Sequence, residues 1–191
     1  MEQQQWNENV ILVDADYIDR VAFDLIVNFE RMIGRRIPQA DLCKWLDCIC
    51  LDGGLRPGGN AVQVFFLHSG EKERLEHFCP QGFADDLSGK AFRDTLGEFA
   101  LQSYATAPVV SLEDFFVESL ETVLLATAVK RVMVVGDMES YGKRLRSKVT
   151  QAEGKEVTLF SMVPETLRGC YTELLGYSLM AALGIRGEEL A

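Results

Sequence analysis

The chain has 191 residues, which suits one globular domain of ordinary size. Hydrophobic residues make up 48% and charged residues 25%, the usual mix of a soluble protein with a buried core. The formal net charge of −10 argues against a broad nucleic-acid-binding or anionic-membrane surface, although it leaves room for a local basic patch. No apolar run approaches the roughly 18 residues of a membrane span, so we expect no membrane partner.

Strand-like and helix-like patterns alternate along the chain. Short apolar runs rich in β-branched residues predict strands at 9–13, 61–68, 99–105, 131–136 and 155–161. Helical spacing of apolar residues predicts helices at 17–33, 39–51, 89–99, 112–127, 138–152 and 164–185. We therefore expect an α/β fold: a single-domain, three-layer sandwich with a mostly parallel, Rossmann-like sheet of about five strands. We expect one domain over 1–191, in which 162–191 forms a C-terminal helical extension.

The five cysteines form no Cys-x-x-Cys pair, and two histidines beside them complete no zinc spacing. The first ten residues, MEQQQWNENV, lack the basic start and apolar core of a targeting signal. An odd number of cysteines without such a signal predicts reduced thiols and a cytoplasmic protein.

Two predicted strands end on acidic residues. The stretch VILVDADYID ends its apolar run at Asp14 and Asp16, and VMVVGDMESYGKRL does the same at Asp137 and Glu139. Glu118 lies on the helix that leads into the second of these strands. Because ligands of parallel sheets bind beyond the carboxyl ends of the strands, we expect these acids to share one edge.

Carboxylates crowded at one edge repel each other unless a cation lies among them. Oxygen ligands without Cys or His suit Mg²⁺ or Mn²⁺, and such an ion can activate a water for attack on a phosphate. We expect Asp14, Glu118, Asp137 and Glu139 to be catalytic metal ligands and Asp16 to be a supporting or alternate one. The alternative is that Asp14 and Asp137 simply cap the following helices and that the acids on 112–127 form a solvated face.

These motifs resemble the NYN domain, a branch of the PIN-like nuclease superfamily. The family's Asp-Gly-(Asp/Glu)-Asn stretch is similar to Asp14-Ala-Asp-Tyr17, and its Ser-Gly-Asp-x-Asp-Phe is similar to Val135-Gly-Asp-Met-Glu-Ser140. Gly154-Lys-Glu-Val157 is similar to the family's next strand opening, and Glu118 stands nineteen residues before Asp137, as an acid does in the family. The resemblance covers about 9–161 and implies a PIN-like fold and a metal-dependent ribonuclease.

The sequence departs from the family at Tyr17, Glu118, Glu139 and Ser140. A Glu in place of an Asp keeps the charge but moves the oxygens outward by a methylene, so a decayed relative of the nuclease is also open. RNA as a partner would need a basic path beside Asp137. The dense basic residues that could line it are Lys130, Arg131, Lys143, Arg144, Arg146 and Lys148.

Two other functions remain open. Asp14-x-Asp16 and Ser69 resemble parts of a haloacid-dehalogenase-like phosphatase, but Tyr17 and Tyr141 stand where that family has other residues and no catalytic lysine is evident. The alternative outside the enzymes is a PIN-like binding or assembly module. The apolar C-terminal segment would then contact a protein partner or a second copy in a homodimer.

Overall fold

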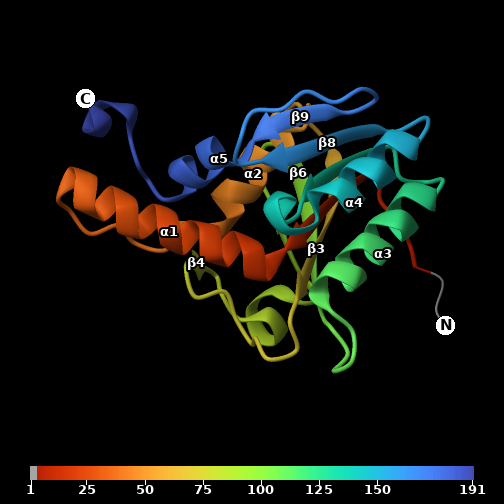
Figure 1. Cartoon of the computed structure of the whole chain (residues 1–191), viewed down its shortest axis with the longest axis horizontal. Coiled ribbons are helices and arrows are strands. Elements are labelled where there is room, and N and C mark those ends of the chain that lie inside the picture. Colours follow the sequence, from red (N-terminus) through yellow and green to blue (C-terminus); the bar gives the residue numbers. More distant parts are fainter. Residues whose placement is uncertain (1–3) are drawn as a thin grey trace.

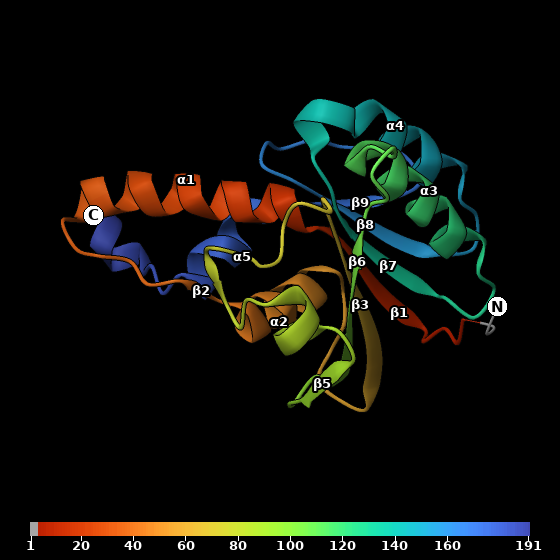
Figure 2. The ribbon, with the colours of Figure 1, turned by 90° about the horizontal axis from the view of Figure 1, so that it is seen from below.

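A seven-stranded sheet runs through the middle of the computed structural model, which describes residues 4–191 (Figures 1 and 2). Its strands lie in the order β5-β6-β3-β1-β7-β8-β9, and every neighbouring pair is parallel except β5 and β6. The strands are β1 Asn9–Asp14, β3 Asn60–His68, β5 Lys90–Arg93, β6 Gly97–Ala105, β7 Arg131–Val135, β8 Glu156–Ser161 and β9 Tyr171–Leu174. Two short strands, β2 Ala40–Asp41 and β4 Phe78–Cys79, pair separately.

Helices cover both faces of this sheet. One face carries α1 Ala15–Ile33, α2 Leu42–Asp52 and α5 Leu175–Ala182, and the other carries α3 Leu112–Leu125 and α4 Met138–Gln151 (Figure 2). Two shorter turns, the π-helical η1 Phe83–Leu87 and the 3-10 η2 Gly187–Leu190, complete the chain. In β1, Ile11 and Val13 enter one apolar cluster while Val10 and Leu12 enter the other. Burial on both faces explains why the strand reads as a continuous apolar run. The predicted α/β, Rossmann-like, three-layer fold is therefore confirmed.

The parallel strands follow the order of a doubly wound sheet. Counted along the chain without β5, they lie as 3-2-1-4-5-6, so the direction of winding reverses between β1 and β7. Val13 is paired with Val135 across these two strands, so both strands end at the same level. Open α/β sheets bind their ligands at this reversal, beyond the carboxyl ends of the two strands.

The predicted helix at 89–99 is wrong. This segment instead forms β5, a turn and the start of β6, an antiparallel pair at the edge of the sheet. Phe92 and Phe99 are cross-strand partners, and their ring centroids lie 4.4 Å apart in a stacked arrangement. Such cross-strand aromatic pairs stabilise a hairpin, and the apolar spacing within the segment did not distinguish this hairpin from a helix.

The predicted long C-terminal helix is also wrong. Strand β9 pairs with β8 at the far edge of the sheet, and α5 covers only eight residues. Trp45 of α2 donates its indole N–H to Ser178 Oγ at 3.1 Å, which fastens α5 against the core. The segment 162–191 is thus part of the sheet and its helical layer, and the sheet has seven strands instead of about five. The remaining predicted helices and strands are present, with ends that differ by a few residues.

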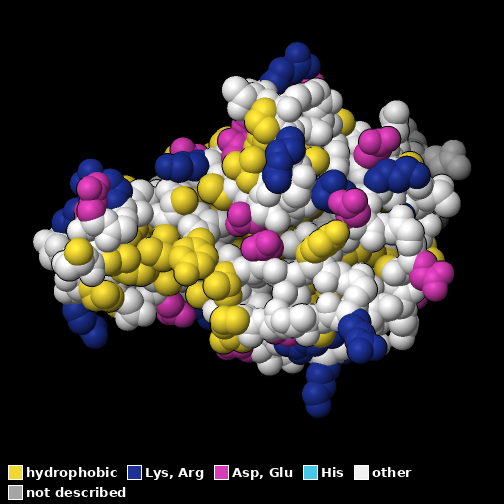
Figure 3. Space-filling model, turned by 90° about the horizontal axis from the view of Figure 1, so that it is seen from above, with side chains coloured by type: hydrophobic (Ala, Val, Ile, Leu, Met, Phe, Trp, Pro, Cys, Tyr) yellow, Lys and Arg dark blue, Asp and Glu magenta, His cyan; other side chains and the backbone are white. Residues whose placement is uncertain are grey.

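Helix α1 projects beyond the sheet, with the C-terminal residues beside it (Figures 1 and 2). Hydrophobic side chains form a band along this side of the molecule (Figure 3). Within residues 4–191, no helix combines the length and the apolar character needed to cross a membrane.

Candidate functional site

Asp14 lies at the junction between β1 and α1. It is the last residue of the strand and the N-cap of the helix, where its Oδ1 accepts the backbone N–H of Tyr17 at 3.0 Å. The hydroxyl of Tyr141, on α4, donates to Oδ2 at 2.5 Å. The Asp14 residue is only 3% exposed, so this carboxylate is held inside the protein by two donors.

Asp137 occupies the equivalent position after β7. It caps α4 by accepting the backbone N–H of Ser140 at 3.1 Å and its hydroxyl at 2.9 Å. A guanidinium nitrogen of Arg20, from α1, lies 2.9 Å from Asp137 Oδ2. The Arg20 side chain is 58% exposed while that of Asp137 is 9% exposed, so the ion pair links a buried acid to a cation at the surface.

A glycine between β7 and Asp137 is required by close packing. A Cβ added at Gly136 would lie 2.7 Å from Leu145 Cδ1 and 3.0 Å from a ring carbon of Phe116. Both distances are shorter than ordinary van der Waals contact. Gly136 therefore lets α3 and α4 approach the end of the strand and brings Asp137 beside β1.

The charges of this region act on one another. The pKa of Asp14 is raised to about 6, chiefly by burial and further by the charges of Asp16 and Asp137, while its two hydrogen bonds oppose the shift. Burial raises the pKa of Tyr17 to about 12, with the charges of Asp137, Glu139 and Asp14 adding to the effect. Burial and the charge of Asp14 likewise raise the pKa of the Tyr141 hydroxyl.

We call the group that these contacts join the switch-point site. Its members are Asp14, Tyr17, Arg20, Asp137 and Tyr141. Perturbed pKa values are typical of functional sites, although structural ion pairs also cause them.

The other predicted acids lie elsewhere. Asp16 accepts the backbone N–H of Ser69 at 3.3 and 3.4 Å, on the β3 side of the edge. Burial raises its pKa, while the charges of Lys72 and His68 lower it. His68 and Lys72 also line a cavity of about 940 Å³ at the ends of β3 and β6. Asp16 therefore points toward a different neighbourhood from Asp137.

Glu118 and Glu139 are both exposed. Glu118 lies on α3, where its backbone carbonyl accepts the hydroxyl of Thr122 at 3.1 Å. Glu139 is in the first turn of α4, close enough for its charge to raise the pKa of Tyr17. The predicted set of five acids thus consists of the buried pair Asp14 and Asp137, two acids whose charges act on the site, Asp16 and Glu139, and Glu118, which is exposed on α3.

Sequence reasoning missed three members of the site. Tyr17 and Arg20 lie one turn apart on α1, and the Arg20 guanidinium carbon sits 5.5 Å from the centre of the Tyr17 ring. The sequence did contain a signal for Arg20: it follows Asp16 by four residues, which places a cation beside the acids at the start of α1. Tyr141 had no such signal: it occupies a kink in α4 with φ of −134°, and its partner lies 127 residues away in the sequence.

The predicted basic path does not lie beside Asp137 as a unit. Arg131 begins β7 and Lys130 directly precedes it, so both lie at the opposite end of the strand from Asp137, about 20 Å away at roughly 3.3 Å per residue. Four of the six residues are held in ion pairs. These are Arg131 with Glu156, Arg144 with Glu113 and Asp114, Arg146 with Glu165, and Lys148 with Glu121.

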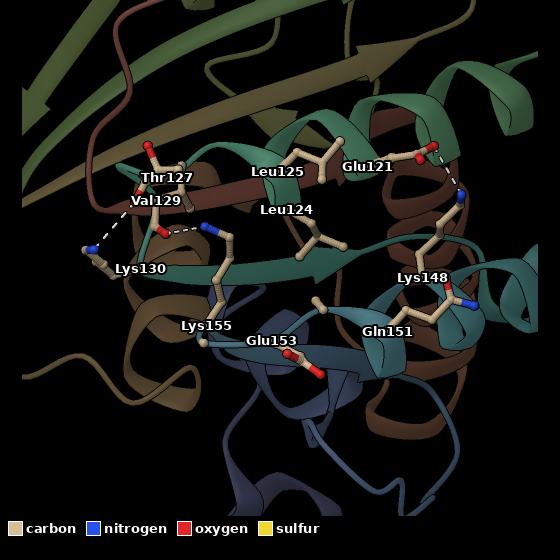
Figure 4. Close-up of a pocket in the computed structure, with 12 residues that line it drawn as sticks. Glu121, Leu124, Leu125, Thr127, Val129, Lys130, Lys148, Gln151, Glu153 and Lys155 are labelled. Carbon is tan, nitrogen blue, oxygen red and sulfur yellow. Dashed lines mark hydrogen bonds and ion pairs between the residues drawn. The ribbon is translucent and has the colours of Figure 1, made fainter.

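The amino edge of the sheet has a cavity of its own, of about 500 Å³, between the ends of α3 and α4 (Figure 4). Lys155 lies across it and donates to the backbone carbonyls of Ala126 at 2.6 Å and Val129 at 2.5 Å. On the far side, Lys148 pairs with Glu121 at 3.1 Å (Figure 4). Lys155 is therefore occupied by the carbonyls that follow α3, and Lys148 is neutralised by Glu121.

No group of three or more His, Cys, Asp or Glu side chains within residues 4–191 is arranged to hold a metal ion. All five cysteines are free thiols.

A family model described as "Family of unknown function (DUF6621)" matches residues 3–190 of the chain. Comparisons with curated proteins and with solved structures gave no match.

Proposed function

The chain belongs to DUF6621, a family of unknown function, and we propose from its own geometry that the switch-point site hydrolyses phosphodiesters with a divalent cation. The observation that carries this proposal is the convergence of Asp14 and Asp137 at the reversal between β1 and β7. RNA is the proposed substrate, because these two acids hold the positions at which the sequence resembles the NYN nucleases. The proposed nuclease activity does not require the exposed Glu118.

The donor chemistry of the site fits Mg²⁺ or Mn²⁺ through two ligands. Mg²⁺ is commonly held by one or two carboxylates, with water and phosphate oxygens completing its octahedral shell. Asp14 and Asp137 would be those carboxylates, and Asp16 and Glu139 are further acids whose charges act on the site. When bound, the ion would stabilise the negative charge that develops on a phosphate ester.

The Asp14 carboxyl is suited to proton transfer. Without the ion, a group with a pKa of about 6 is largely ionised at neutral pH and still accepts a proton readily, and a bound cation would lower this pKa. Tyr141 donates to Oδ2 and Tyr17 N–H to Oδ1, so the carboxylate has a fixed orientation. Asp14 would take the proton from the water that attacks the phosphorus atom.

Arg20 is suited to positioning the phosphate. One of its guanidinium nitrogens is engaged by Asp137, and more than half of the side chain is exposed. The remaining N–H groups can donate to the oxygens of a phosphate, for which the planar guanidinium is well matched. The same ion pair competes with a cation for Asp137, so Arg20 would have to shift when both ligands bind.

A non-enzymatic binding module is the second candidate, and a specific observation favours it. All four carboxylate oxygens of Asp14 and Asp137 already accept hydrogen bonds within the chain. In that reading the two acids are helix caps alone. The phosphatase alternative has less support, because Ser69 does not contact Asp14. Tyr17 and Tyr141 bond to Asp14, and the backbone N–H of Ser69 bonds to Asp16.

Calorimetric titration with Mn²⁺ tests the metal step, using the wild type, Asp14→Asn and Asp137→Asn. Glu153→Gln is the matched control, because it removes one exposed acid at the opposite edge of the sheet. We expect saturable binding in the wild type and the control and its loss in both site variants. Absence of binding up to about millimolar Mn²⁺, the weak end of protein sites for hard cations, would favour the binding module.

Hydrolysis is tested separately with a fluorescently labelled single-stranded RNA and a matched phosphomonoester. We expect Mn²⁺-dependent cleavage of the RNA that falls by at least about 100-fold in Asp14→Asn, the usual scale for loss of a general base. Binding of the ion without cleavage of either substrate would contradict the hydrolytic role.

A further inference from the structure

A large polar cavity lies beside the switch-point site, where β3 and β6 end. It has a volume of about 940 Å³ and is bounded by β3, β6, the loop after β3 and the turn η1. Asp14 pairs with Leu67 in the sheet, and His68 is the next residue of β3. Because neighbouring strands lie about 4.8 Å apart and rise about 3.3 Å per residue, the Cα atoms of Asp14 and His68 are about 6 Å apart. The cavity is therefore within reach of a chain that passes over the switch-point site.

His68 has an unused bonding group in this cavity. The residue is only 6% exposed, and its ring stacks on Phe83 with centroids 3.8 Å apart and an interplanar angle of 7°. Its Nδ1 lies 2.9 Å from the carbonyl oxygen of Ser69, which can only accept, so Nδ1 carries the proton. In the neutral ring Nε2 is then an acceptor, and no group within residues 4–191 is bonded to it.

The Nε2 atom of His68 is open to the cavity. Among the described residues, the fully buried side-chain nitrogen or oxygen that lacks a partner is Asp47 Oδ1, so Nε2 is not sealed inside the protein. His68 lines the cavity and is otherwise enclosed by its stack on Phe83. A buried ring with a fixed orientation and one accessible nitrogen is a preorganised acceptor for a ligand.

The part of the lining that comes from η1 and β6 supplies further acceptors. Ser88 and Ser103 donate their hydroxyl hydrogens within the chain, to Gln102 Oε1 at 3.1 Å and to the Phe83 carbonyl at 3.0 Å. Each of these hydroxyl oxygens can still accept a hydrogen bond. A ligand in this cavity must therefore bring N–H or O–H donors.

The charged residues of the lining limit the charge of that ligand. Glu73, Asp85 and Asp86 are exposed acids, and Lys72 and Arg74 are exposed cations. Three acids against two cations disfavour a ligand with several negative charges.

Two of these charged residues are available to a ligand. Asp86 accepts the N–H of Gly82 at 2.8 Å, whereas Asp85 has no hydrogen-bond partner in the described part of the chain. Arg74 is paired with Glu76 at 3.2 Å. Lys72 lies on the side of Asp16, because its charge opposes the burial that raises the pKa of that acid. The cavity thus offers an acceptor at Asp85 and a cation at Lys72, toward the switch-point site.

We propose that this cavity, the His68 pocket, binds one nucleotide of single-stranded RNA next to the scissile phosphate, through a base that donates N–H groups. The assignment rests on the proposed function, which supplies RNA as the substrate. Guanine presents two adjacent N–H donors on its Watson–Crick edge, for which His68 Nε2 and Asp85 are acceptors. Uracil presents carbonyl oxygens on both sides of its single N–H, and these would face acceptors. Lys72 would pair with the single negative charge of the adjoining phosphodiester.

Calorimetric titration of the full chain tests the pocket, with a chelator present so that no divalent cation takes part. The probes are guanylyl-uridine and uridylyl-uridine, which differ in one base and carry one phosphodiester each. We expect guanylyl-uridine to bind with a dissociation constant of about 0.1 mM or less. Uridylyl-uridine should bind at least about tenfold more weakly, because it leaves acceptors unpaired. Guanosine triphosphate should also bind at least about tenfold more weakly, because it carries several negative charges.

Three variants locate the binding. His68→Phe keeps a ring against Phe83 and removes Nε2, so the affinity for guanylyl-uridine should fall at least about tenfold. Lys72→Gln and Asp85→Asn change exposed side chains, and each should lower the affinity by about threefold or more. Circular dichroism verifies that each variant is folded.

Lys130→Gln and Glu153→Gln are the matched controls. They make the same charge changes on exposed residues at the amino edge of the sheet, so both should bind like the wild type. No binding of guanylyl-uridine by the wild type would overturn the pocket, and so would binding that all three pocket variants leave unchanged. Tighter binding of guanosine triphosphate than of guanylyl-uridine would overturn the assignment to RNA and identify a free nucleotide instead.

Failure of the hydrolytic proposal is seen separately, in the Mn²⁺-dependent cleavage of RNA. Binding of guanylyl-uridine without RNA cleavage supports the pocket and rejects hydrolysis alone. RNA cleavage without guanylyl-uridine binding, at a rate that His68→Phe leaves unchanged, rejects the pocket alone.

Discussion

The two ends of β1 and β7 have opposite charge chemistry. At the carboxyl edge, Asp14 and Asp137 accept N–H groups from the first turns of α1 and α4. At the amino edge, Arg131 donates to the carbonyl of Gly53 after α2, and Lys155 donates to that of Ala126 after α3. Parallel α/β units place helix N-termini at one edge and C-termini at the other. The helix dipole therefore favours acids at the first edge and bases at the second.

What separates the two edges is how the charges are balanced. At the amino edge, cations lie beside acids, as Arg131 does with Glu156 at 2.7 Å. At the carboxyl edge, two buried acids lie near each other, and within residues 4–191 a cation, Arg20, pairs with one of them, Asp137. A single acid at the end of a strand is thus explained by its role as the cap of the next helix. The pairing of two such acids is what points to a function.

The packing that brings the two acids together can be broken at Gly136. In Gly136→Val, the added side chain meets Leu145 and Phe116 and forces α4 or α3 away from β7. We expect the free energy of unfolding to fall by about 3 kcal/mol, at the upper end of the cost of overpacking a core. Guanidinium denaturation measures the loss. Gly59→Ala, where an added Cβ contacts nothing, is the control and should change stability by less than about 1 kcal/mol.

The mutual effect of the acids can be measured through pH. The pKa of Asp14 is raised to about 6 from 3.8, so the folded protein keeps this proton more tightly than the unfolded chain. Between those pH values the free energy of unfolding therefore falls as pH rises, by up to about 3 kcal/mol at 1.36 kcal/mol per unit. Asp14→Asn should lack this slope.

Urea denaturation of both proteins from pH 4 to pH 8 gives the difference between them. Asp47, whose pKa is raised to about 7 chiefly by burial and a hydrogen bond with Asp94, adds a slope of the same sign in both proteins. It therefore cancels in the comparison. Equal slopes for the wild type and Asp14→Asn would show that Asp14 is not buried as an acid.

The amino edge is tested by Lys155→Met, which keeps the aliphatic stem and removes the ammonium. The carbonyls of Ala126 and Val129 lose their donor at 2.6 and 2.5 Å, so we expect a loss of about 2 kcal/mol, typical of hydrogen bonds from a charged group. Thermal unfolding gives the change. Lys130→Met is the control, because its ammonium makes only one long contact of 3.5 Å, with Thr127 O. Similar losses in both would mean that Lys155 does not close the end of α3.

Removal of Arg20 should have the smallest effect on stability and a distinct effect on binding. In Arg20→Gln we expect the free energy of unfolding to fall by less than about 1 kcal/mol, because the Arg20 side chain is largely exposed to solvent. Under the proposed function, Mn²⁺ should then bind up to about fivefold more tightly, because its competitor for Asp137 is gone. Arg20→Lys keeps the charge and should bind like the wild type. Weaker Mn²⁺ binding in Arg20→Gln would contradict this competition.

Much of the fold follows from local patterns in the sequence. The apolar runs of β1 and β7 consist of consecutive residues, and the caps at Asp14 and Asp137 join residues three apart, so the sequence alone predicts them. Tertiary contacts decided the remainder. The hairpin of β5 and β6 depends on the pairing of Phe92 with Phe99, and β9 depends on the free edge of β8. Neither condition can be seen in the local spacing of residues.

The candidate site divides in the same way. That Asp14 and Asp137 lie at one edge follows from the order of strands and helices. Their partners do not: Arg20 reaches Asp137 across 117 residues, and Tyr141 reaches Asp14 across 127. Those contacts exist because β1 and β7 are neighbours in the sheet, a pairing that only the folded chain selects. The sequence by itself thus determined where acids end strands, and the tertiary structure decided which of them meet and what neutralises them.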